Sequence, residues 1–507
     1  MVQLLRKGSF KPVHGHALTA EQRMAILRSS MFAKVKHFPN GEIEALKERL
    51  VAGGDMQDKT LYDDLSSPTV STAAVFAMAA IAAREHRKVR VFDIGGAFLH
   101  SEMEAFVVIR LNRELTEILV NLMPEYSTFV GKDGCMLLQL LRALYGCVEA
   151  ALLWFKNISG MLKSVGFVAN PADICTLNCD RQGNQLTVQI HVDDLKCSCA
   201  QDSELDWLRD ELMRAYDGEV KEKPGEILDY LGMTFDYTVG SRVAITMKGY
   251  IEDLCSSSGV TGTALTPAGA NIFEIDDESP SLDPEDGAWF HSFVMKCMYL
   301  GKRVRPEILT AISFLASRAT KSTEQDKKKL HRVIKYLQGS KHLGLCLSAS
   351  DNVEILAFVD ASHGVHADGK GVTGGLISLG TGAIDSTSTK QKINTKSSTE
   401  TELVGGSDYA SQAIWARDFV VGQGYQVGPA ALHQDNQSTM ALIAKGRSTA
   451  PKTRHIRLRY FWLKDRVDSG ELIIKYLPTG EMLADVLTKP LQGEDFFWMR
   501  DRLLGYV

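Results

Sequence analysis

The segment LTVQIHVDDLKCSC, Leu186 to Cys199, carries the strongest structural signal in this sequence. Apolar and polar residues alternate on both sides of Asp193-Asp194, and this period of two is typical of half-buried strands. We therefore expect a β-hairpin with two carboxylates at its tip. Turn chemistry alone explains such a pair, because Asp bonds to nearby backbone in tight turns. A bound divalent cation is the alternative, since it would relieve the repulsion between adjacent carboxylates.

Length and composition are those of a folded chain with several domains. The 507 residues suggest about three domains. A hydrophobic share of 45% and a charged share of 23% are ordinary for soluble globular protein. The net charge of −5 gives no global nucleic-acid signature, so any such binding must come from local basic stretches.

Cysteine usage and hydropathy indicate the compartment. The nine cysteines are scattered and no second ligand pair stands at zinc spacing, so we expect reduced thiols inside a cell. The N-terminus lacks the sustained apolar core of a secretory signal. The apolar run from Ala73 to Ala83 is too short to span a bilayer and predicts a buried helix. We therefore expect no membrane partner.

Strand-like and helical stretches surround the hairpin. Residues 46–58 predict a strand that runs into a glycine turn, and 89–100 predict a strand that carries Asp93. Residues 136–167 indicate strand, turn and helix, and 203–216 have helical periodicity. This order predicts an α+β domain around a mixed sheet.

The remaining segments divide into four parts. Residues 22–36 are compatible with a helix, and 256–286 read as an extended connector. Residues 289–345 are predominantly helical. From Val353 a second α/β pattern begins, and it includes a long amphipathic helix that ends at Gly470.

Carboxylates form two sets in the two α/β patterns. Asp93 and the Asp193-Asp194 pair each end a strand-like run, so neighbouring strands would bring three carboxylates to one sheet edge. Oxygen ligands of this type suit Mg²⁺, and paired ions catalyse in-line phosphoryl transfer. The second set is Asp360, Glu402, Asp435 and Asp485.

Structural alternatives exist for two members of the second set. Thr399 and Glu402 fit a capping box. Ser397 and Glu400 fit one as well, which would leave Glu402 free to point elsewhere. Asp435 fits a helix cap.

Several motifs, in order, resemble the polymerase and nuclease segments of one family. VFDIGGAFLH, LLRALYGCVEAALLWF, IHVDDL and YLGM are similar to the reverse transcriptase of Ty1/copia-type LTR retrotransposons. VDAS, TKSSTETEL, HQDNQSTMAL, KTRHIRLRYFWLKDRVDSGELIIKYLPT and LADVLTKPL resemble the ribonuclease H that follows it in the Pol polyprotein. The resemblance covers about residue 45 to the end.

The resemblance implies an α+β right-hand polymerase with fingers, palm and helical thumb, followed by an α/β ribonuclease H-like domain. Fingers and palm would occupy 46–245, a connector and thumb-like region 246–350, and the ribonuclease H-like domain 351–507. Residues 1–45 are an N-terminal segment without an assigned role.

The resemblance also implies catalytic roles for both carboxylate sets. Asp93, Asp193 and Asp194 would hold metal for the polymerase, where a primer 3′-hydroxyl attacks the α-phosphate of a dNTP. The second set would cut RNA in an RNA–DNA hybrid. Each site would use two Mg²⁺ ions, with Mn²⁺ as a substitute.

Substrate contacts are carried over position by position, with plain alternatives for each. Lys47 and Arg49 would meet the triphosphate, or they are two solvated charges on a strand edge. Phe98 would screen the sugar and Tyr145 with Gly146 would line the nucleotide pocket, although both rings also suit a core. A last segment, Tyr230, Leu231 and Gly232, would hold the primer end.

The sequence departs from the family at three places. His191 replaces the usual aromatic residue of the hairpin motif, and Ala150-Ala151 stands where Ala-Pro is common. YLPTGEMLAD supplies no counterpart of the mobile catalytic histidine of cellular ribonucleases H, and His455 is not assigned that role.

Local basic residues would meet the nucleic acid. Arg454, Arg457 and Arg459 give the late helix a positive bias, and Lys327 to Lys329 add a second patch. A solvated helix face is the alternative for both. The implied partners are an RNA template, a DNA primer, their hybrid and dNTPs, with other Pol products such as integrase. The implied location is a cytoplasmic virus-like particle, followed by nuclear entry.

The sequence thus predicts an RNA-directed DNA polymerase with a C-terminal ribonuclease H. A decayed or domesticated remnant that binds nucleic acid without catalysis is the main alternative. Seven intact candidate carboxylates argue against it. An unrelated metal-dependent nuclease would leave the polymerase-like half unexplained.

Overall fold

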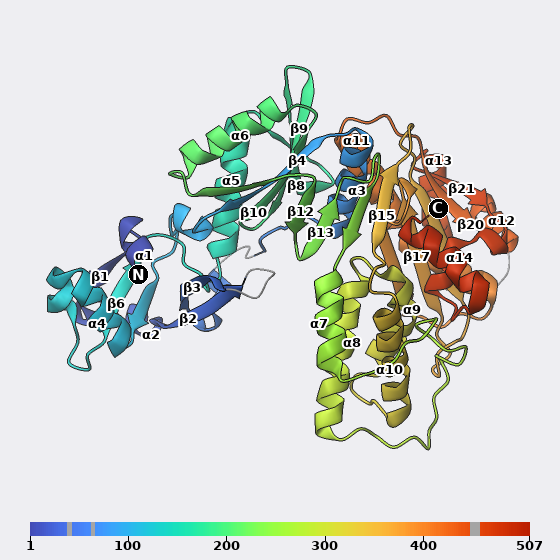
Figure 1. The fold of residues 1–507 in the computed structure, drawn as a ribbon, viewed down its shortest axis with the longest axis horizontal. Coiled ribbons are helices and arrows are strands. Elements are labelled where there is room, and N and C mark those ends of the chain that lie inside the picture. Colours follow the sequence, from blue (N-terminus) through green and yellow to red (C-terminus); the bar gives the residue numbers. More distant parts are fainter. Residues whose placement is uncertain (38–42, 62–65, 447–456, 507) are drawn as a thin grey trace.

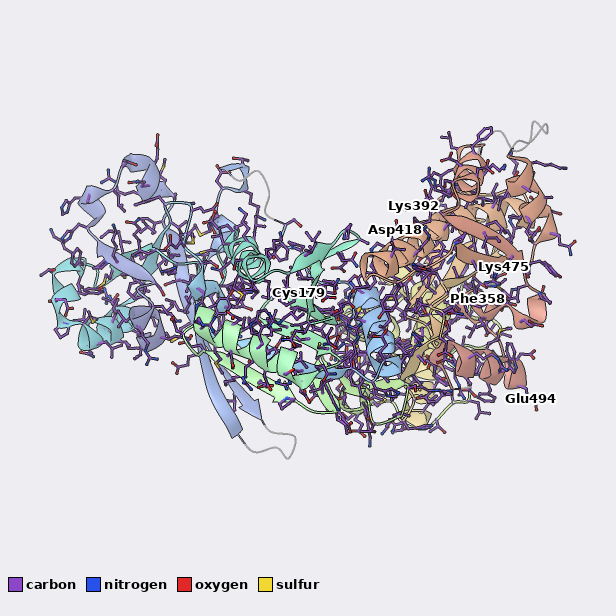
Figure 2. The ribbon with its side chains drawn as sticks, turned by 90° about the horizontal axis from the view of Figure 1, so that it is seen from above. Cys179, Phe358, Lys392, Asp418, Lys475 and Glu494 are labelled. Atoms are coloured by element: carbon purple, nitrogen blue, oxygen red, sulfur yellow. The ribbon has the colours of Figure 1, made fainter. Side chains whose placement is uncertain are left out.

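The computed structural model describes residues 1–37, 43–61, 66–446 and 457–506. It has a mixed α+β fold with four sheets, which confirms the expected class. Figure 1 shows the N-terminal elements at one end and the C-terminal sheet at the other. Seen from above, Cys179 lies near the middle, and Phe358 and Glu494 lie toward the C-terminal end (Figure 2). Within the described residues, no helix is long and apolar enough to cross a membrane.

The N-terminal sheet has the strand order β1-β6-β5-β2-β3. Its β2 and β3 form a long antiparallel hairpin, and β2 also pairs with β5 in parallel. The elements of this lobe are α1 (Val2–Arg6), β1 (Phe10–Val13), α2 (Ala20–Met24), β2 (Leu27–His37), β3 (Ile43–Ala52), β5 (Val108–Leu111), α4 (Arg113–Leu122) and β6 (Met136–Leu140).

The expectation of a helix over residues 22–36 is wrong. The helix α2 ends at Met24 and strand β2 follows from Leu27. Backbone pairing with β3, the next strand along the chain, runs continuously from Ser29 to Lys36, so hydrogen bonds between the two strands of this hairpin decide the conformation here.

The central sheet has the order β11-β4-β10-β9-β8-β7, and it contains the predicted hairpin as β9 and β10. The expected buried helix is confirmed as α3, and Gln189 of β9 donates a side-chain hydrogen bond to the Ala74 carbonyl of α3 at 3.0 Å. The elements are α3 (Thr72–Arg84), β4 (Lys88–Ile94), α5 (Ala150–Ser164), β7 (Val168–Asn170), β8 (Asp173–Arg181), β9 (Asn184–His191), β10 (Asp194–Cys199), α6 (Asp202–Ala215) and β11 (Val220–Pro224).

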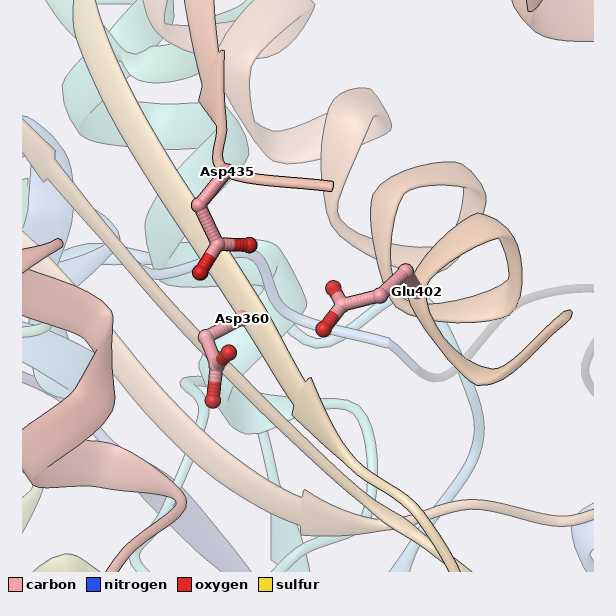
Figure 3. A group of neighbouring side chains, drawn as sticks. All are labelled: Asp360, Glu402 and Asp435. Carbon is pink, nitrogen blue, oxygen red and sulfur yellow. The ribbon is translucent and has the colours of Figure 1, made fainter. Parts of the chain in front are cut away.

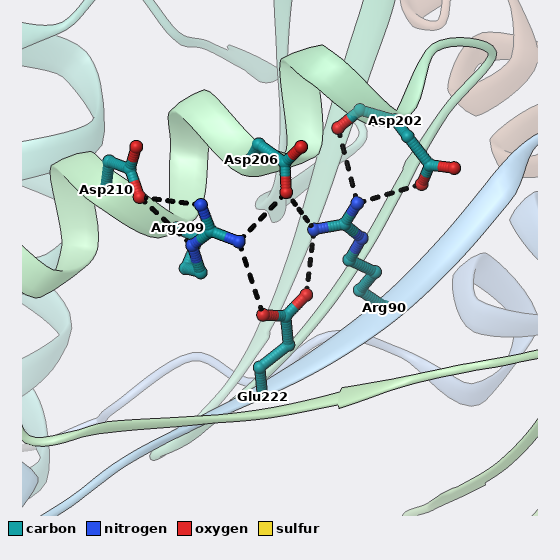
Figure 4. A network of polar contacts seen from close by, with 6 residues as sticks. All are labelled: Arg90, Asp202, Asp206, Arg209, Asp210 and Glu222. Atoms are coloured by element: carbon teal, nitrogen blue, oxygen red, sulfur yellow. Dashed lines mark hydrogen bonds and ion pairs between the residues drawn. The ribbon is translucent and has the colours of Figure 1, made fainter.

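An ion-pair network holds α6 against β4 and β11. The Arg90 guanidinium donates to Asp202, Asp206 and Glu222 at 2.8 to 2.9 Å (Figure 4). Arg209 contacts Asp206 at 2.9 Å and Glu222 at 3.9 Å, so the two arginines share partners. Because Arg90 lies on β4, the network fixes the strand that carries Asp93.

A third sheet, β12-β13-β14-β15-β18, joins the central part to the C-terminal part. Between β14 and β15 the chain forms the expected helical segment, which projects below the sheets in Figure 1. The elements are β12 (Ile227–Tyr230), β13 (Met233–Asp236), β14 (Val243–Thr246), α7 (Lys248–Ser258), α8 (Pro284–Gly301), α9 (Leu309–Ser317), α10 (Glu324–Gly339), β15 (Leu345–Ala349) and β18 (Gly380–Thr381).

The C-terminal sheet has the order β19-β17-β16-β20-β21, in which β16, β20 and β21 run parallel. Its elements are β16 (Leu356–Ser362), β17 (Val372–Ser378), β19 (Asp385–Lys390), α11 (Ser398–Gly422), β20 (Ala430–Gln434), α12 (Gln437–Lys445), α13 (Arg457–Asp468), β21 (Leu472–Tyr476) and α14 (Gly493–Leu504). The second α/β pattern of the sequence is therefore confirmed.

Two buried apolar clusters form the core. One lies within the N-terminal lobe and includes Ile109 and Leu138. The other runs without interruption from α3 through the helical segment into the C-terminal sheet. Polar contacts support that continuity, since Trp415 of α11 donates to the Ala172 carbonyl at 2.9 Å and Asn170 donates to the Phe419 carbonyl at 2.8 Å.

Candidate active sites

The predicted hairpin is confirmed, and its tip is held from two sides. Val192 and Asp193 form the turn, and Val192 has a φ of 56°, which is costly for a β-branched residue. Trp154 donates its indole N–H to the Val192 carbonyl at 2.6 Å, and the Ile94 N–H donates to the Asp193 carbonyl at 3.0 Å. The hairpin tip is therefore fixed against α5 and β4.

The strand register brings Asp93 and Asp194 together. Asp194 stands opposite Asp93 on β4 and opposite His191 on β9, and Asp193 lies in the adjoining turn. The expectation that the two strands are neighbours is confirmed. Within the described part of the chain, however, three metal-ligand groups with atoms within 4.8 Å of one another occur only at the second carboxylate set. An ion shared by the three hairpin-side aspartates therefore requires rotation of their side chains.

Two residues beside these aspartates are unusual. The His191 Nδ1 is buried and has no partner in the described structure; burial lowers the pKa of its ring, against the charge of Asp193. Tyr230 is 2% exposed and its hydroxyl is likewise unpaired. Burial raises the pKa of that hydroxyl and the nearby Asp194 charge adds to the shift, so the carboxylate lies near Tyr230.

The residues expected at the nucleotide meet in one row, Arg49–Tyr145–Phe98. The Arg49 guanidinium carbon lies 4.7 Å from the centroid of the Tyr145 ring. The Tyr145 and Phe98 rings are 4.9 Å apart between centroids, at 53°. Arg49 and Tyr145 are exposed, so the row has an open side. Lys47 lies on β3, but its side chain is outside the described residues.

Backbone conformation explains the glycines of this region. Gly146 has a φ of 92°, and a Cβ there would lie 2.1 Å from the Ala52 carbonyl oxygen. The Ala52 N–H donates to the Tyr145 carbonyl at 2.8 Å, so the turn packs directly on β3. Gly96, with a φ of 63°, supplies a turn between Asp93 and Phe98.

The segment Tyr230, Leu231 and Gly232 is the tight turn between β12 and β13. Tyr230 pairs with Met233, and Leu231 and Gly232 have φ values of 53° and 75°. Such a pair of left-handed residues is typical of a two-residue hairpin turn. This turn projects from the third sheet beside the central one.

The second carboxylate set converges because β16 and β20 are parallel. Asp360 lies on β16 and Asp435 directly follows β20, so both reach the same sheet edge, where Glu402 projects from α11 (Figure 3). Their carboxylate oxygens lie within 4.8 Å of one another. Oxygen ligands at this spacing fit one hard divalent cation.

Both structural alternatives for this set are wrong. The N-cap of α11 is Ser397, whose hydroxyl accepts from the Glu400 N–H at 3.3 Å, so Glu402 is not a capping residue. The N-cap of α12 is Asn436, which accepts from the Thr439 N–H at 3.0 Å, so Asp435 is not the cap.

Asp485 joins the set through a lysine. Lys489 Nζ lies 2.8 Å from Asp485 Oδ1 and 3.4 Å from Asp360 Oδ1. The Thr488 hydroxyl donates to Asp360 Oδ2. Asp485 is not part of the three-carboxylate group. The expected set of four carboxylates therefore consists of a close group, Asp360, Glu402 and Asp435, and of Asp485. The Lys489 ammonium bridges Asp485 to Asp360.

Crowding of buried acids controls the electrostatics. Burial raises the pKa of Glu402 to about 9, and the charges of Asp360 and Asp435 add to the shift. Burial and Asp360 raise the pKa of Asp485 to about 7, against the charge of Lys489. Burial lowers the pKa of the Lys489 ammonium, but the negative charges of Asp360 and Asp485 have the larger effect, so the pKa is raised overall. Such a site favours binding of positive charge.

An open pocket of about 460 Å³ contains the three carboxylates, Lys489 and His363. The sequence reasoning missed Lys489, Thr488 and His363, although Lys489 follows Asp485 by four residues, a spacing that places side chains together on one turn. The His363 Nδ1 lies 2.8 Å from the Thr401 hydroxyl oxygen, a contact that sequence spacing does not reveal.

The basic helix is largely engaged with acids. Arg459 donates to Asp408 of α11, and Lys464 and Arg466 pair with acidic side chains on their own or adjoining segments. Arg454 lies outside the described residues, and so does the side chain of Arg457.

Comparison with known proteins identifies the class. Residues 31–268 match the family model of reverse transcriptase (RNA-dependent DNA polymerase). The chain therefore carries a reverse transcriptase domain. More particularly, over about nine tenths of its length the chain is similar to the reverse transcriptase region of Ty1/copia-type retrotransposon Pol polyproteins.

Three relatives support the particular type. The Pol polyprotein from transposon TNT 1-94 of Nicotiana tabacum is 24% identical over 480 residues, 93% of this chain and 35% of that protein. The polyprotein from transposon RE1 of Arabidopsis thaliana is 25% identical over 468 residues, with 91% and 30% covered. The Ty1-MR1 Gag-Pol polyprotein of Saccharomyces cerevisiae is 23% identical over 477 residues, with 89% and 26% covered. The chain thus spans about a third of their length or less.

Among solved structures, the match to the prototype foamy virus protease-reverse transcriptase covers 97% of this chain and 54% of the foamy virus chain. Its sequence identity is 14% and its TM-score is 0.27.

Proposed function

We propose that the chain is an RNA-directed DNA polymerase with a C-terminal ribonuclease H. One observation carries the proposal: two carboxylate sets, Asp93 with Asp193-Asp194 and Asp360 with Glu402 and Asp435, stand at the edges of two separate sheets. Metal-assisted phosphoryl transfer needs this donor chemistry. The domain bounds proposed from the sequence are 46–245, 246–350 and 351–507, and the first domain is extended to take in residues 1–45, because strands β1 and β2 lie in the same sheet as β3, β5 and β6.

In the polymerase, the central sheet is the palm, the N-terminal sheet the fingers and helices α7–α10 the thumb. Two Mg²⁺ or Mn²⁺ ions would be held by Asp93, Asp193 and Asp194, and would lower the charge barrier to attack of the primer hydroxyl. The row Arg49–Tyr145–Phe98 orients a dNTP, with Arg49 toward phosphate and Phe98 toward sugar. The turn Tyr230–Gly232 supports the primer end.

In the ribonuclease H, Asp360, Glu402 and Asp435 hold a divalent ion, and Asp485 completes the set. The oxygen-only donors fit Mg²⁺ or Mn²⁺, because both prefer carboxylates. Glu402 must lose its proton for an ion to bind there, since the pKa of its carboxyl is about 9 without one. The substrate is the RNA strand of the hybrid that the polymerase makes.

The proposed partners are an RNA template, a DNA primer, their hybrid and dNTPs, together with other Pol products such as integrase. The proposed location is a cytoplasmic virus-like particle, followed by nuclear entry. Arg454, Arg457 and Arg459 are proposed to contact the hybrid backbone.

Two single substitutions test the proposal on the full chain. Asp193→Asn removes a polymerase ligand and should abolish primer extension on an RNA template but leave hybrid cleavage. Asp435→Asn should abolish cleavage and leave extension. Both activities are measured with Mg²⁺ and dNTPs, and circular dichroism checks the fold. Wild-type protein that is folded, binds hybrid and shows neither activity would instead be a non-catalytic remnant.

A further inference from the structure

The Lys489 ammonium lies between the carboxylates of Asp360 and Asp485. It is 2.8 Å from Asp485 Oδ1 and 3.4 Å from Asp360 Oδ1. The carboxylates are 6% and 3% exposed, whereas the Lys489 side chain is 37% exposed. A cation is thus already present at one side of Asp360.

Asp360 also belongs to a second group of carboxylates in the same pocket. There its oxygens lie within 4.8 Å of those of Glu402 and Asp435, and no lysine or arginine ion pair with either of these two acids is seen in the described residues. Asp360 is therefore shared by two cation positions. The first position lies among the carboxylates of Asp360, Glu402 and Asp435. The second lies between the carboxylates of Asp360 and Asp485, where the Lys489 ammonium now stands.

Backbone contacts hold the base of Lys489 in place. The N–H groups of Lys489 and Thr488 donate to the Asp485 carbonyl at 2.7 and 3.1 Å. The Thr488 hydroxyl donates a hydrogen bond to Asp360 Oδ2. The ammonium itself sits on a long, partly exposed side chain, so it can leave without movement of the backbone.

We propose that Lys489 holds the place of a second divalent ion in the substrate-free protein. The C-terminal site then binds one ion, at Asp360, Glu402 and Asp435, and admits another between Asp360 and Asp485 only when the ammonium has left. The inference rests on the proposed ribonuclease H, and it makes Lys489 a positioning residue that separates the two binding steps.

Mn²⁺ titration of the substrate-free full chain tests this inference, with free Mn²⁺ read by electron paramagnetic resonance. All variants carry Asp193→Asn and Asp194→Asn, so that the hairpin contributes no ion. Lys489→Met removes the ammonium and keeps the side-chain length, whereas Lys489→Arg keeps the charge. Lys390→Met is the matched control, because Lys390 pairs with Asp368 at 2.8 Å and is 35% exposed, but lies outside the site.

We expect one tightly bound ion in the background protein, in Lys489→Arg and in Lys390→Met, and two in Lys489→Met. Two ions in the background protein, or one ion in folded Lys489→Met, would overturn the role of Lys489 and leave the proposed nuclease standing. No tightly bound ion in any variant would overturn both. Thermal unfolding with and without Mn²⁺ provides the fold check, since a loaded site raises the midpoint.

Discussion

The ring centroids of Tyr145 and Phe98 lie 4.9 Å apart, and the Arg49 guanidinium carbon lies 4.7 Å from the centroid of the Tyr145 ring. Three residues from distant parts of the chain thus form one wall, and Phe98 stands at its end next to the strand of Asp93. In the proposed polymerase, a ring in that place would exclude a 2′-hydroxyl by contact.

Phe98→Val should therefore raise ribonucleotide use relative to dNTP use and keep polymerisation detectable. The measurement is single-nucleotide incorporation of matched dNTP and rNTP on one primer. Phe106→Val is the control, because Phe106 is 48% exposed and lies outside the row. An unchanged ratio in active Phe98→Val would make Phe98 a packing residue.

The pKa of Glu402 gives the C-terminal site a defined pH dependence. An ion at this site must displace the Glu402 proton below about pH 9, so log K for Mn²⁺ should rise by about one for each pH unit from 6 to 8. Glu402→Gln should bind Mn²⁺ more weakly and with a flatter slope. Titrations at several pH values measure both, and a slope equal to that of Glu402→Gln would contradict the assignment.

The same carboxyl also makes the ion-free fold less stable as pH rises. The pKa of Glu402 is raised from 4.5 to about 9, so between these values the unfolded state binds fewer protons than the folded state. Its contribution to the free energy of unfolding therefore falls as pH rises through this window. Urea unfolding of chelator-treated protein at pH 6 and pH 8.5 should show this fall, and Glu402→Gln should reduce it.

A fully buried ion pair lies in the helical segment. Arg305 and Glu307 are 0% and 1% exposed, their charged groups are 2.7 Å apart, and Tyr336 also donates to Glu307. Glu307→Ala leaves a buried guanidinium unpaired and should lower the free energy of unfolding by about 3–5 kcal/mol. Asp133→Ala, which breaks the exposed pair with Arg110, should lower the free energy of unfolding far less, because water screens that pair. Denaturant unfolding compares them.

Hybrid binding should depend on the basic residues proposed to contact its backbone. Changing Arg454, Arg457 and Arg459 together to Ala should weaken binding and flatten its dependence on salt, because fewer counterions are released. Arg459→Ala alone should do less, since that guanidinium already pairs with Asp408. Binding titrations at several salt concentrations decide between these, and an unchanged slope in the triple variant would assign all three to a solvated face.

The local pattern determined the elements that carry both carboxylate sets. Alternation around Asp193-Asp194 predicted the hairpin, and the apolar run at Ala73 predicted α3, because side-chain periodicity reports the face that an element buries. Residues 27–37 did not follow this logic. Their conformation comes from pairing with β3 in a hairpin, and the apolar pattern of one strand carries no information about hydrogen bonds to its partner strand.

Only the tertiary structure decided which charges meet. The sequence placed Asp360, Glu402, Asp435 and Asp485 in one set, but the parallel pairing of β16 and β20 is what brings three of them within 4.8 Å. The fourth is separated from them by Lys489, and Arg459 is turned from solvent to Asp408. Periodicity fixes the face on which a side chain lies, whereas the partner of a charge depends on strands and helices that are distant in the chain.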